Sequence, residues 1–354
     1  MKKKKTNLII KNKERLCTRA PMRISFAGGG TDINHYFQKY SGAVINATIC
    51  KFSYAEICLA EQPFIAESLD FKKELVFKED LKKENIPKEL ILHFAAYNHI
   101  IKEFNNSNHL NIKLSTYVDA PIGSGLGSSS TLVVAIVKAF NELLVLGLDD
   151  YSIASLAYKI ERIDCGILGG KQDQYSAAFG GVNFIEFNSD NTIVNTLKIK
   201  NWFKCELESS FILHFTGVSR HSSDVIEDQR QSVIKNFEDE LNSLHQIKKE
   251  VYSIKNYFLQ SDRNGIRDSL NKGWEYKKKT SKNVSNNFID QRIKIGLENG
   301  AEAAKVSGAG GGGFILFMCN PRNGINLRNR LLKESSETFF CNFNDKGAQS
   351  WIVN

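Results

Sequence analysis

The stretch Asp119-Ala-Pro-Ile-Gly-Ser-Gly-Leu-Gly-Ser-Ser-Ser-Thr131 decides the fold, because it joins a strand pattern to a helix pattern. Residues 111–118, just before it, alternate apolar and polar side chains, as a half-buried strand does. Residues 131–144, just after it, are almost all apolar or good helix formers, and Gly147 follows in the position of a helix C-cap. The pattern therefore predicts a strand, a glycine loop and a buried helix in succession.

The loop itself has the composition of an anion-binding site. Gly123, Gly125 and Gly127 allow the backbone to approach a ligand closely. The serines at 128–130 open a helix whose free N–H groups and positive dipole end suit a phosphate. The alternative is a tight turn that binds nothing, but such a turn does not require three glycines and three hydroxyl groups.

Two common phosphate-binding loops do not match this sequence. A Walker A loop requires Gly-Lys followed by Ser or Thr, and the nearest string, Gly170-Lys171, is followed by Gln172. A dinucleotide fingerprint requires a third glycine at the position that Ser128 occupies. The loop is therefore neither a P-loop nor a Rossmann fingerprint.

The string from Pro121 to Ser130 resembles the second motif of the GHMP kinases, the superfamily of galactokinase, homoserine kinase, mevalonate kinase and phosphomevalonate kinase. The resemblance implies ATP as the phosphate donor. It implies that ATP is bound by Pro121, Gly123, Ser124, Gly125, Leu126, Gly127, Ser128, Ser129 and Ser130.

The same resemblance implies an α+β fold of two domains. The N-terminal domain, over residues 1–195, is expected to be ribosomal-S5-like and to carry the ATP loop and the sugar site. The C-terminal domain, over residues 196–354, is expected to be ferredoxin-like. We place the boundary by composition alone, because the glycine loops stop near residue 191.

A second glycine-bearing segment, Arg19-Ala-Pro-Met-Arg-Ile-Ser-Phe-Ala-Gly-Gly-Gly-Thr-Asp32, runs from a strand pattern into a loop. Met22, Ile24 and Phe26 share one face of that strand, and Arg23 projects from the other. The segment resembles the first GHMP motif in the form that heptose 7-phosphate kinases and fucokinases carry. Galactokinases carry a Gly-Glu-His-Thr-Asp sequence instead, and this difference disfavours galactose as the substrate.

The resemblance implies that Asp32 accepts hydrogen bonds from the hydroxyl groups of a sugar. Gly29, Gly30 and Thr31 are expected to line the same substrate site. An alternative is that Asp32 caps a helix that begins at Ile33.

A third segment, Lys305 to Phe314, holds five glycines in residues 308–313. It resembles the third GHMP motif, with Ser307 in the Ser/Thr position. The resemblance implies that this segment packs beside the first motif and that Gly310 lines the substrate pocket. The alternative is a glycine-rich hinge without a ligand.

The segment Gly170-Lys-Gln-Asp-Gln174 resembles the part of galactokinases and heptose kinases that supplies the catalytic aspartate. Asp173 is therefore the candidate base, because a kinase that acts on a sugar hydroxyl needs a carboxylate to orient it and take its proton. Arg23 is expected to keep Asp173 ionised and to reach toward the γ-phosphate. Lys171 is a second candidate cation, and a helix-capping Asp173 is the alternative.

A candidate metal ligand lies near the C-terminal end of the helix predicted over residues 151–163. Glu161 is unfavourable there against the helix dipole, so a compensating cation is expected. By resemblance to mevalonate-type kinases, Glu161 and either Ser129 or Ser130 hold Mg²⁺, which prefers hard oxygen ligands. A solvated Glu161 is the alternative.

A weaker resemblance concerns the segment Thr216-Gly-x-x-Arg-x-Ser-Ser223, which is similar to a segment of heptose kinases. It implies that Arg220, together with His221, contacts the phosphate of the substrate, because a guanidinium group matches phosphate geometry. An ordinary surface loop is an equally good interpretation.

Periodicity in the rest of the chain predicts further elements. Strands are expected over residues 43–59, 182–187, 211–217 and 314–319. Helices are expected over residues 89–104 and 290–304, and one long helix or two over residues 224–258.

Composition excludes several classes of protein. The chain of 354 residues has no run of about eighteen apolar residues, so no membrane span is expected. Its seven cysteines lack C-x-x-C spacing, which favours reduced thiols in the cytoplasm over disulfides or zinc. The net charge of +8 comes from dispersed lysines, so it suits anionic small molecules better than nucleic acid.

Taken together, the resemblance implies a cytoplasmic enzyme, a monomer or homodimer, that uses ATP and Mg²⁺ to phosphorylate a sugar phosphate. The first motif and the segment around Asp173 are most similar to the D-glycero-D-manno-heptose 7-phosphate kinases. That group phosphorylates the C1 hydroxyl to give the 1,7-bisphosphate for nucleotide-heptose and surface-polysaccharide synthesis, including capsule or lipopolysaccharide. The alternatives are a fucokinase or galactokinase, a catalytically inactive sugar sensor, and a nucleic-acid-binding protein.

Overall fold

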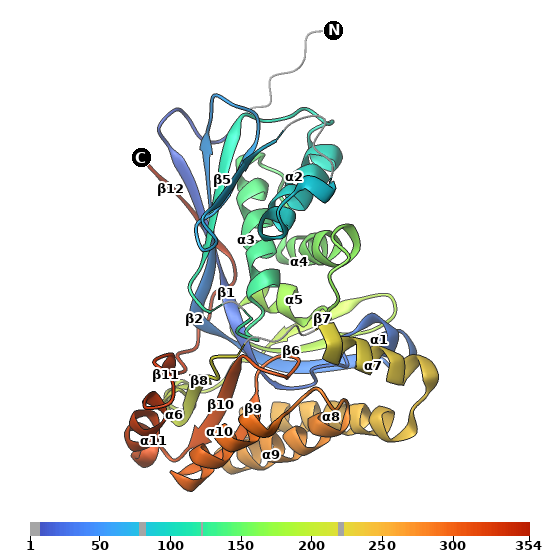
Figure 1. Ribbon diagram of the computed structural model, residues 1–354, viewed down its shortest axis with the longest axis vertical. Coiled ribbons are helices and arrows are strands. Elements are labelled where there is room, and N and C mark those ends of the chain that lie inside the picture. Colours follow the sequence, from blue (N-terminus) through green and yellow to red (C-terminus); the bar gives the residue numbers. More distant parts are fainter. Residues whose placement is uncertain (1–7, 78–82, 122, 219–222) are drawn as a thin grey trace.

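The computed structural model describes residues 8–77, 83–121, 123–218 and 223–354. In these residues the chain forms an eight-stranded sheet with helices on one face and, below it, a four-stranded sheet with its own helices (Figure 1). The α+β class predicted from the sequence is confirmed.

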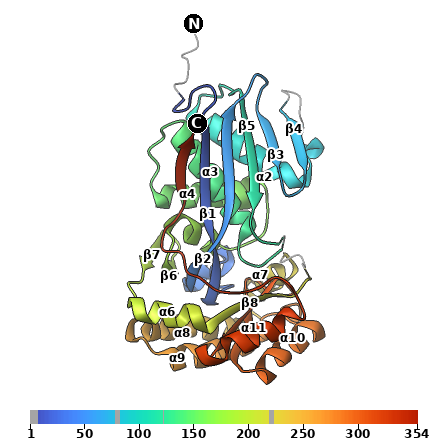
Figure 2. The ribbon, with the colours of Figure 1, turned by 90° about the vertical axis from the view of Figure 1, so that its left-hand side faces the viewer.

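The larger sheet has the order β12-β1-β2-β5-β3-β4, and β6 pairs with β2 and with β7. Figure 2 shows the first six of these strands side by side. The bounds are β1 Arg15–Ala27, β2 Gly42–Leu59, β3 Ile65–Ser68, β4 Lys73–Val76, β5 Ile112–Val118, β6 Val182–Phe187, β7 Thr192–Thr196 and β12 Gln349–Val353. Strand β2 is long enough to pair with β6 along its first half and with β5 along its second.

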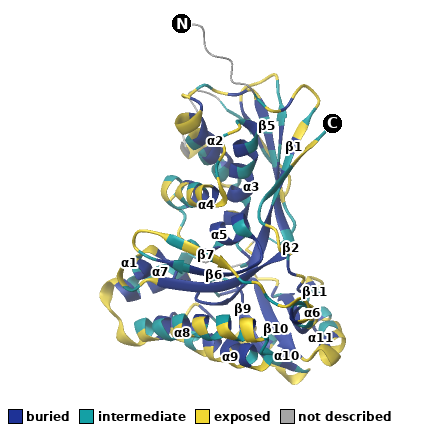
Figure 3. Cartoon of the chain, turned by 180° about the vertical axis from the view of Figure 1, so that it is seen from behind, coloured by how far each residue is buried: buried dark blue, intermediate teal, exposed yellow. Residues whose placement is uncertain are grey.

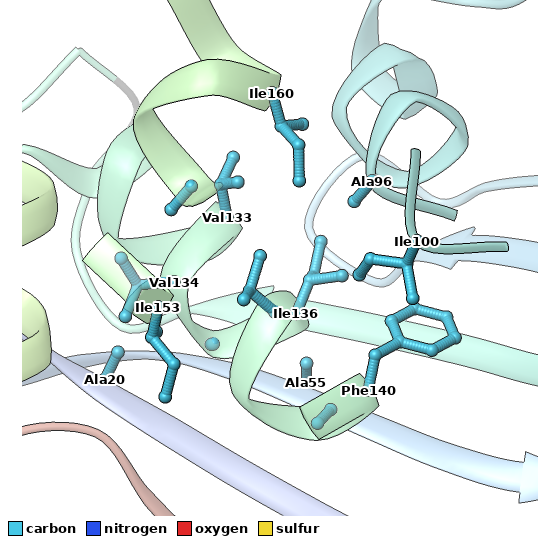
Figure 4. Packing of buried hydrophobic residues seen from close by; sticks show 14 of the residues in the cluster. Ala20, Ala55, Ala96, Ile100, Val133, Val134, Ile136, Phe140, Ile153 and Ile160 are labelled. Carbon is cyan, nitrogen blue, oxygen red and sulfur yellow. The ribbon is translucent and has the colours of Figure 1, made fainter. Parts of the chain in front are cut away.

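Helices cover one face of this sheet, and α3 lies at their centre (Figure 1). They are α2 Ile91–Phe104, α3 Ser128–Leu143, α4 Asp150–Tyr158 and α5 Gln172–Phe179. Val134 of α3 lies beside Ile153 of α4, and Ile136 lies toward Ile100 of α2 and Ala55 of the sheet, all in one buried cluster (Figure 4). Because α3 is apolar on most sides, it is stable only when it is enclosed in this way.

The smaller sheet is antiparallel, with the order β11-β8-β10-β9. Its strands are β8 Phe211–Phe215, β9 Ala301–Val306, β10 Phe314–Cys319 and β11 Thr338–Phe340. The helices around it are α6 Asn201–Ser210, α7 Ser223–Lys235, α8 Glu238–Gln260, α9 Arg263–Lys279, α10 Asn287–Glu298 and α11 Gly324–Leu332. Helices α8 and α9 are exposed on their outer faces and buried on their inner faces (Figure 3).

The two sheets share a hydrophobic core at the end of β1. The ring of Phe26 lies 5.5 Å from that of Phe211 and 5.0 Å from that of Phe258, measured between centroids. The ring of Phe343 lies 6.4 Å from that of Phe26. The first strand is therefore anchored by aromatic side chains from the second half of the chain.

Two predicted elements are wrong at their ends. Helix α3 ends at Leu143, and the left-handed residue after it is Val145 (φ 52°), so Gly147 is not the C-cap. The helix predicted over 290–304 stops at Glu298, and the residues that follow form β9. Pairing with β10 overrides the helix propensity of the alanines in that strand.

The last strand departs from the expected domain organisation. Strand β12 belongs by sequence to the C-terminal half, but it pairs antiparallel with β1 in the larger sheet. The domain boundary between residues 195 and 196 stays a prediction. After β11 of the smaller sheet, the chain returns to the larger sheet. None of the described helices is both long and apolar enough to cross a membrane.

Phe26→Ala should lower the free energy of unfolding by about 3–5 kcal/mol, because it removes a buried ring that packs against both halves. Chemical denaturation of the two proteins measures this difference. Ile325→Ala is the matched control, since Ile325 is 65% exposed and its truncation should change stability little. Equal losses from the two substitutions would contradict the shared core.

Candidate active site

One cavity of about 440 Å³ lies between the two sheets, and the three glycine-bearing segments line it together. The first motif contributes Gly29, Gly30 and Asp32, and Ile33 follows directly after it. The second motif contributes residues 123–130 except 124 and 126, and the third contributes residues 307–312 except 311. Residues 167–173 except Lys171, and Lys277 of α9, form further parts of the wall. The structure therefore brings together segments that are nearly 300 residues apart in the chain.

The second and third motifs touch backbone to backbone. A Cβ atom added at Gly125 (φ +74°) would lie 2.6 Å from the carbonyl oxygen of Ser307, closer than side chains are found. The N–H of Phe314 donates to the carbonyl oxygen of Ser124 at 2.8 Å. Only glycine at position 125 permits this contact, so the two loops are held as one unit.

The second motif presents its backbone to the cavity at the start of α3. Gly127 is the N-cap residue (φ +80°), and no side chain caps the helix. Ser128, Ser129 and Ser130, which line the cavity, form the first turn, whose N–H groups have no partner inside a helix. This arrangement is suited to bind the phosphates of a nucleotide.

Three predicted ATP-binding residues are placed elsewhere. Leu126 is fully buried in the shared core, and its carbonyl oxygen accepts the N–H of Arg23. The Ser124 hydroxyl accepts the N–H of Leu126 at 3.3 Å, and the carbonyl oxygen of Pro121 accepts the N–H of Ser124. These residues shape the loop, because alternate side chains point away from the cavity.

Asp173 and Arg23 form an ion pair in the wall of the cavity. The guanidinium NH2 lies 2.6 Å from Oδ1 of Asp173, and Nε donates to the same oxygen at 2.7 Å. The NH1 group donates to the carbonyl oxygen of Gly125 at 2.7 Å. Arg23 is 3% exposed, so this bridge between the carboxylate and the second motif is shielded from water.

The helix-capping alternative for Asp173 is wrong. The N-cap of α5 is Lys171, and it makes no side-chain cap. The structure also corrects the prediction for Lys171 itself, which does not line the cavity. Its Nζ lies over the rings of Phe37 (4.6 Å) and Tyr158 (5.3 Å), and burial lowers its pKa.

Asp32 is buried in the wall of the cavity, just before helix α1. Its carboxylate accepts the N–H of Gly30 at 3.0 Å and that of Gln172 at 3.2 Å. Burial and the nearby Asp173 carboxylate raise its pKa. Helix α1 (Asn34–Tyr40) has Ile33 as its N-cap, with no side-chain cap, so the capping alternative is wrong.

The remaining predicted substrate residues divide into two groups. Gly29, Gly30 and Gly310 line the cavity. Thr31 does not, because its hydroxyl lies within hydrogen-bond distance, 2.8 Å, of the carbonyl oxygens of Gly28 and Ala43 and thereby fixes the turn. Arg220 lies outside the described residues, and its contact with phosphate stays a prediction.

Glu161 lies in a turn of π-helix, Lys159–Asp164, that continues α4. Such turns occur often at functional sites. The carboxylate is 1% exposed and accepts the Ser129 hydroxyl at 2.8 Å and the Gln174 amide at 2.7 Å. The solvated alternative for Glu161 is therefore wrong.

Arg162, which sequence reasoning missed, completes this network. It lies 3.2 Å from Glu161 and donates to the Ser130 hydroxyl at 3.0 Å. It also donates to the carbonyl oxygens of Leu168 and Gly170. The loop before Asp173 is thus tied to the start of α3.

Two buried lysines were also missed. Lys277 of α9 lines the cavity and donates to the carbonyl oxygen of Gly29 at 2.9 Å, and Lys305 of β9 donates to that of Ser25. Burial lowers the pKa of Lys277 to about 8 and that of Lys305 to about 7. Helical periodicity offered a signal for Lys277, because it shares a face with the buried Leu270.

Comparisons with known proteins agree with this geometry. The family model described as GHMP kinases N terminal domain matches residues 89–181, and the one described as GHMP kinases C terminal matches residues 254–337. The chain belongs to the GHMP kinase superfamily.

Within that superfamily, the chain is 42% identical over 340 residues to D-glycero-alpha-D-manno-heptose 7-phosphate kinase of Campylobacter jejuni, covering 95% of this chain and 98% of the relative. The crystal structure of a D-glycero-D-manno-heptose 1-phosphate kinase from Bacteroides thetaiotaomicron matches with a TM-score of 0.79 at 36% identity, over 96% and 99% of the two chains. An L-fucokinase/L-fucose-1-P guanylyltransferase of Bacteroides fragilis is 24% identical over 94% of this chain and 38% of its own length.

Proposed function

We propose that the protein transfers the γ-phosphoryl group of ATP to the C1 hydroxyl of D-glycero-D-manno-heptose 7-phosphate, giving the 1,7-bisphosphate. The observation that carries the proposal is the ion pair of Asp173 with the buried Arg23, set between the second motif and the loop that ends at Asp32. The identity of 42% to a heptose 7-phosphate kinase supports this acceptor.

The nucleotide fits the half of the cavity that opens from α3. The phosphates meet the free N–H groups at Ser128 and Ser129 and the positive end of the helix dipole. Apolar side chains beside this half suit an adenine ring: Phe71, Ile91, Leu92, Val118 and Leu132.

The acceptor fits the half that the first motif lines. Asp32 is positioned to accept hydrogen bonds from sugar hydroxyls, and Gly29 and Gly30 give the ring room to approach the backbone. Gly170 contributes to this position, because a Cβ atom there would overlap the Asp32 carboxylate. Asp32 is thereby held as a fixed acceptor.

Asp173 orients the C1 hydroxyl and accepts its proton. As the bond from that oxygen to phosphorus forms, the bond from phosphorus to the β–γ bridging oxygen breaks and ADP leaves. Arg23 holds the carboxylate in place and sits next to the charge that develops on the phosphoryl oxygens. Positioning contributes as much as basicity here, because phosphoryl-transfer transition states are loose.

Mg²⁺ fits the oxygen atoms beside the ATP loop. No group of three His, Cys, Asp or Glu side chains able to hold a metal occurs among the described residues, but Mg²⁺ often takes one or two carboxylates and completes its shell with phosphates and water. Glu161 and Ser129 offer a carboxylate and a hydroxyl that already touch. The bound ion would neutralise charge on the phosphates. Ser130 is the weaker candidate, because its hydroxyl oxygen already accepts hydrogen bonds from Arg162 and Gln174.

The alternatives have less support. A fucokinase relative is only 24% identical, and the Gly-Glu-His sequence of galactokinases is absent from the first motif. An inactive sugar sensor does not require a carboxylate held by a buried arginine. The proposal places the reaction in the cytoplasm, in a monomer or homodimer that binds no nucleic acid, and assigns its product to nucleotide-heptose and surface-polysaccharide synthesis.

A panel of acceptors tests the proposal. ATP consumption should be fastest with heptose 7-phosphate and at least about tenfold slower with fucose, galactose, mevalonate or homoserine at equal concentration. Phosphorus NMR of the product should show a new phosphate on C1. Preference for any unphosphorylated sugar would overturn the assigned acceptor while leaving the kinase class intact.

Asp173→Asn should lower kcat by roughly 10²–10⁴, because an amide cannot take the proton of the hydroxyl. Steady-state kinetics with saturating ATP and acceptor measure the change. Asp190→Asn, a substitution of an exposed aspartate, should leave kcat unchanged. Near-normal turnover in Asp173→Asn would remove this residue from the mechanism.

Ser129→Ala should raise the Mg²⁺ concentration needed for half-maximal activity by roughly tenfold, the lower end of the effect expected for a group that supports a metal. Titration with MgCl₂ at fixed ATP measures it, and Ser209→Ala, at an exposed position on α6, serves as the control. An unchanged Mg²⁺ dependence would argue against Ser129 as a ligand.

A further inference from the structure

Lys277 is a buried cation of the cavity that the proposed reaction does not use. It is 8% exposed and enters from α9, in the C-terminal half of the chain. Within the described part of the chain its ammonium makes one hydrogen bond, to the carbonyl oxygen of Gly29, and no ion pair. Burial lowers its pKa, and the nearby Asp32 carboxylate opposes that shift without forming an ion pair.

This placement is unfavourable for a residue that only supports the fold. An ammonium carries three donors, and a buried charge with a single neutral partner costs free energy. Helix α9 would bury the same face equally well with an apolar side chain, since Ile266, Leu270 and Trp274 precede Lys277 on it. By contrast, Lys272 of the same helix is exposed.

The charged groups that other elements bring near Lys277 already have partners of their own. Arg23 from β1 is engaged with Asp173 from α5, and Lys305 from β9 donates to a backbone carbonyl. Asp32, from the loop after β1, is satisfied by two backbone N–H groups. Among the described residues, none of these groups pairs with the Lys277 ammonium, so two of its three donors are left for a ligand.

We propose that Lys277 is a substrate-binding residue whose ammonium donates hydrogen bonds to a phosphoryl group in the cavity. Phosphoryl oxygens are the acceptors that a desolvated ammonium prefers. The inference rests on the proposed function, and two sources can supply this group: the phosphate of the sugar and the terminal phosphate of ATP. The bond to Gly29 places Lys277 on the acceptor loop, which favours the phosphate of the sugar.

The first test compares stability with affinity in Lys277→Met, Lys277→Arg and the control Lys272→Met. Without ligands, Lys277→Met should melt no lower than the wild type, because it removes a buried charge. Its KM for heptose 7-phosphate should nevertheless rise about 10- to 100-fold, the range for a hydrogen bond to a charged group. Lys277→Arg should recover part of this affinity, and Lys272→Met should match the wild type.

The two sources of the phosphoryl group separate by substrate. A higher KM for heptose 7-phosphate, with unphosphorylated heptose used equally well by both proteins, assigns Lys277 to the phosphate of the sugar. A higher KM for ATP assigns it to the nucleotide. Both KM values within twofold of the wild type would overturn the inference, and so would a fall in Tm of more than about 5 °C, which marks a structural group.

Binding of inorganic phosphate tests Lys277 independently of turnover. Phosphate should raise the Tm of the wild type and of Lys272→Met more than that of Lys277→Met, because a ligand stabilises only a protein that binds it. An equal rise in all proteins, or no rise in any, would count against the inference. If the wild type does not phosphorylate heptose 7-phosphate, the proposed function is contradicted, while the phosphate-binding result for Lys277 still stands.

Discussion

The close contact between two glycine loops is the constraint on which the rest of this structure depends. The second motif follows β5 and opens α3, and the third motif connects β9 to β10, so their contact joins the two halves of the chain. A side chain at Gly125 would meet the carbonyl of Ser307, and one at Gly308 would lie 2.7 Å from the carbonyl of Gly125. The cavity exists because neither loop carries side chains where they meet. This explains why both segments are rich in glycine although they belong to different sheets.

Arg23 converts that backbone frame into a chemical site. Its guanidinium group holds Asp173 and the carbonyl oxygen of Gly125 at once, so the carboxylate and the ATP loop cannot move independently. Asp32, Lys277 and Glu161 are likewise buried at the cavity and hydrogen-bonded mainly to backbone or to neutral side chains. Buried charges of this kind reduce stability and are kept where function requires a preorganised field. The large aromatic core around Phe26 offsets that cost.

The sequence predicted those parts of the fold and site that depend on local pattern. Alternation fixed β5 and periodicity fixed the body of α3, because both follow from which side chains can be buried. The segments that line the cavity were identified from glycines and short motifs. Individual side chains were less predictable: Thr31 and Leu126 belong to the right loops, but they point into the protein and not into the cavity. Lys171 is two residues before Asp173, at the N-cap of α5, and its Nζ lies over aromatic rings instead.

By itself, then, the sequence determined the family, the α+β class and the candidate carboxylates, because each is encoded within a short run of residues. Only the tertiary structure decided which charges meet. The pairing of Arg23 with Asp173 joins residues 150 positions apart, and Lys277 reaches Gly29 across 248. The pairing of β12 with β1 in the larger sheet likewise joins segments that are far apart in the chain. Such contacts depend on how the two sheets dock, and docking is set by the whole core, which no local pattern contains.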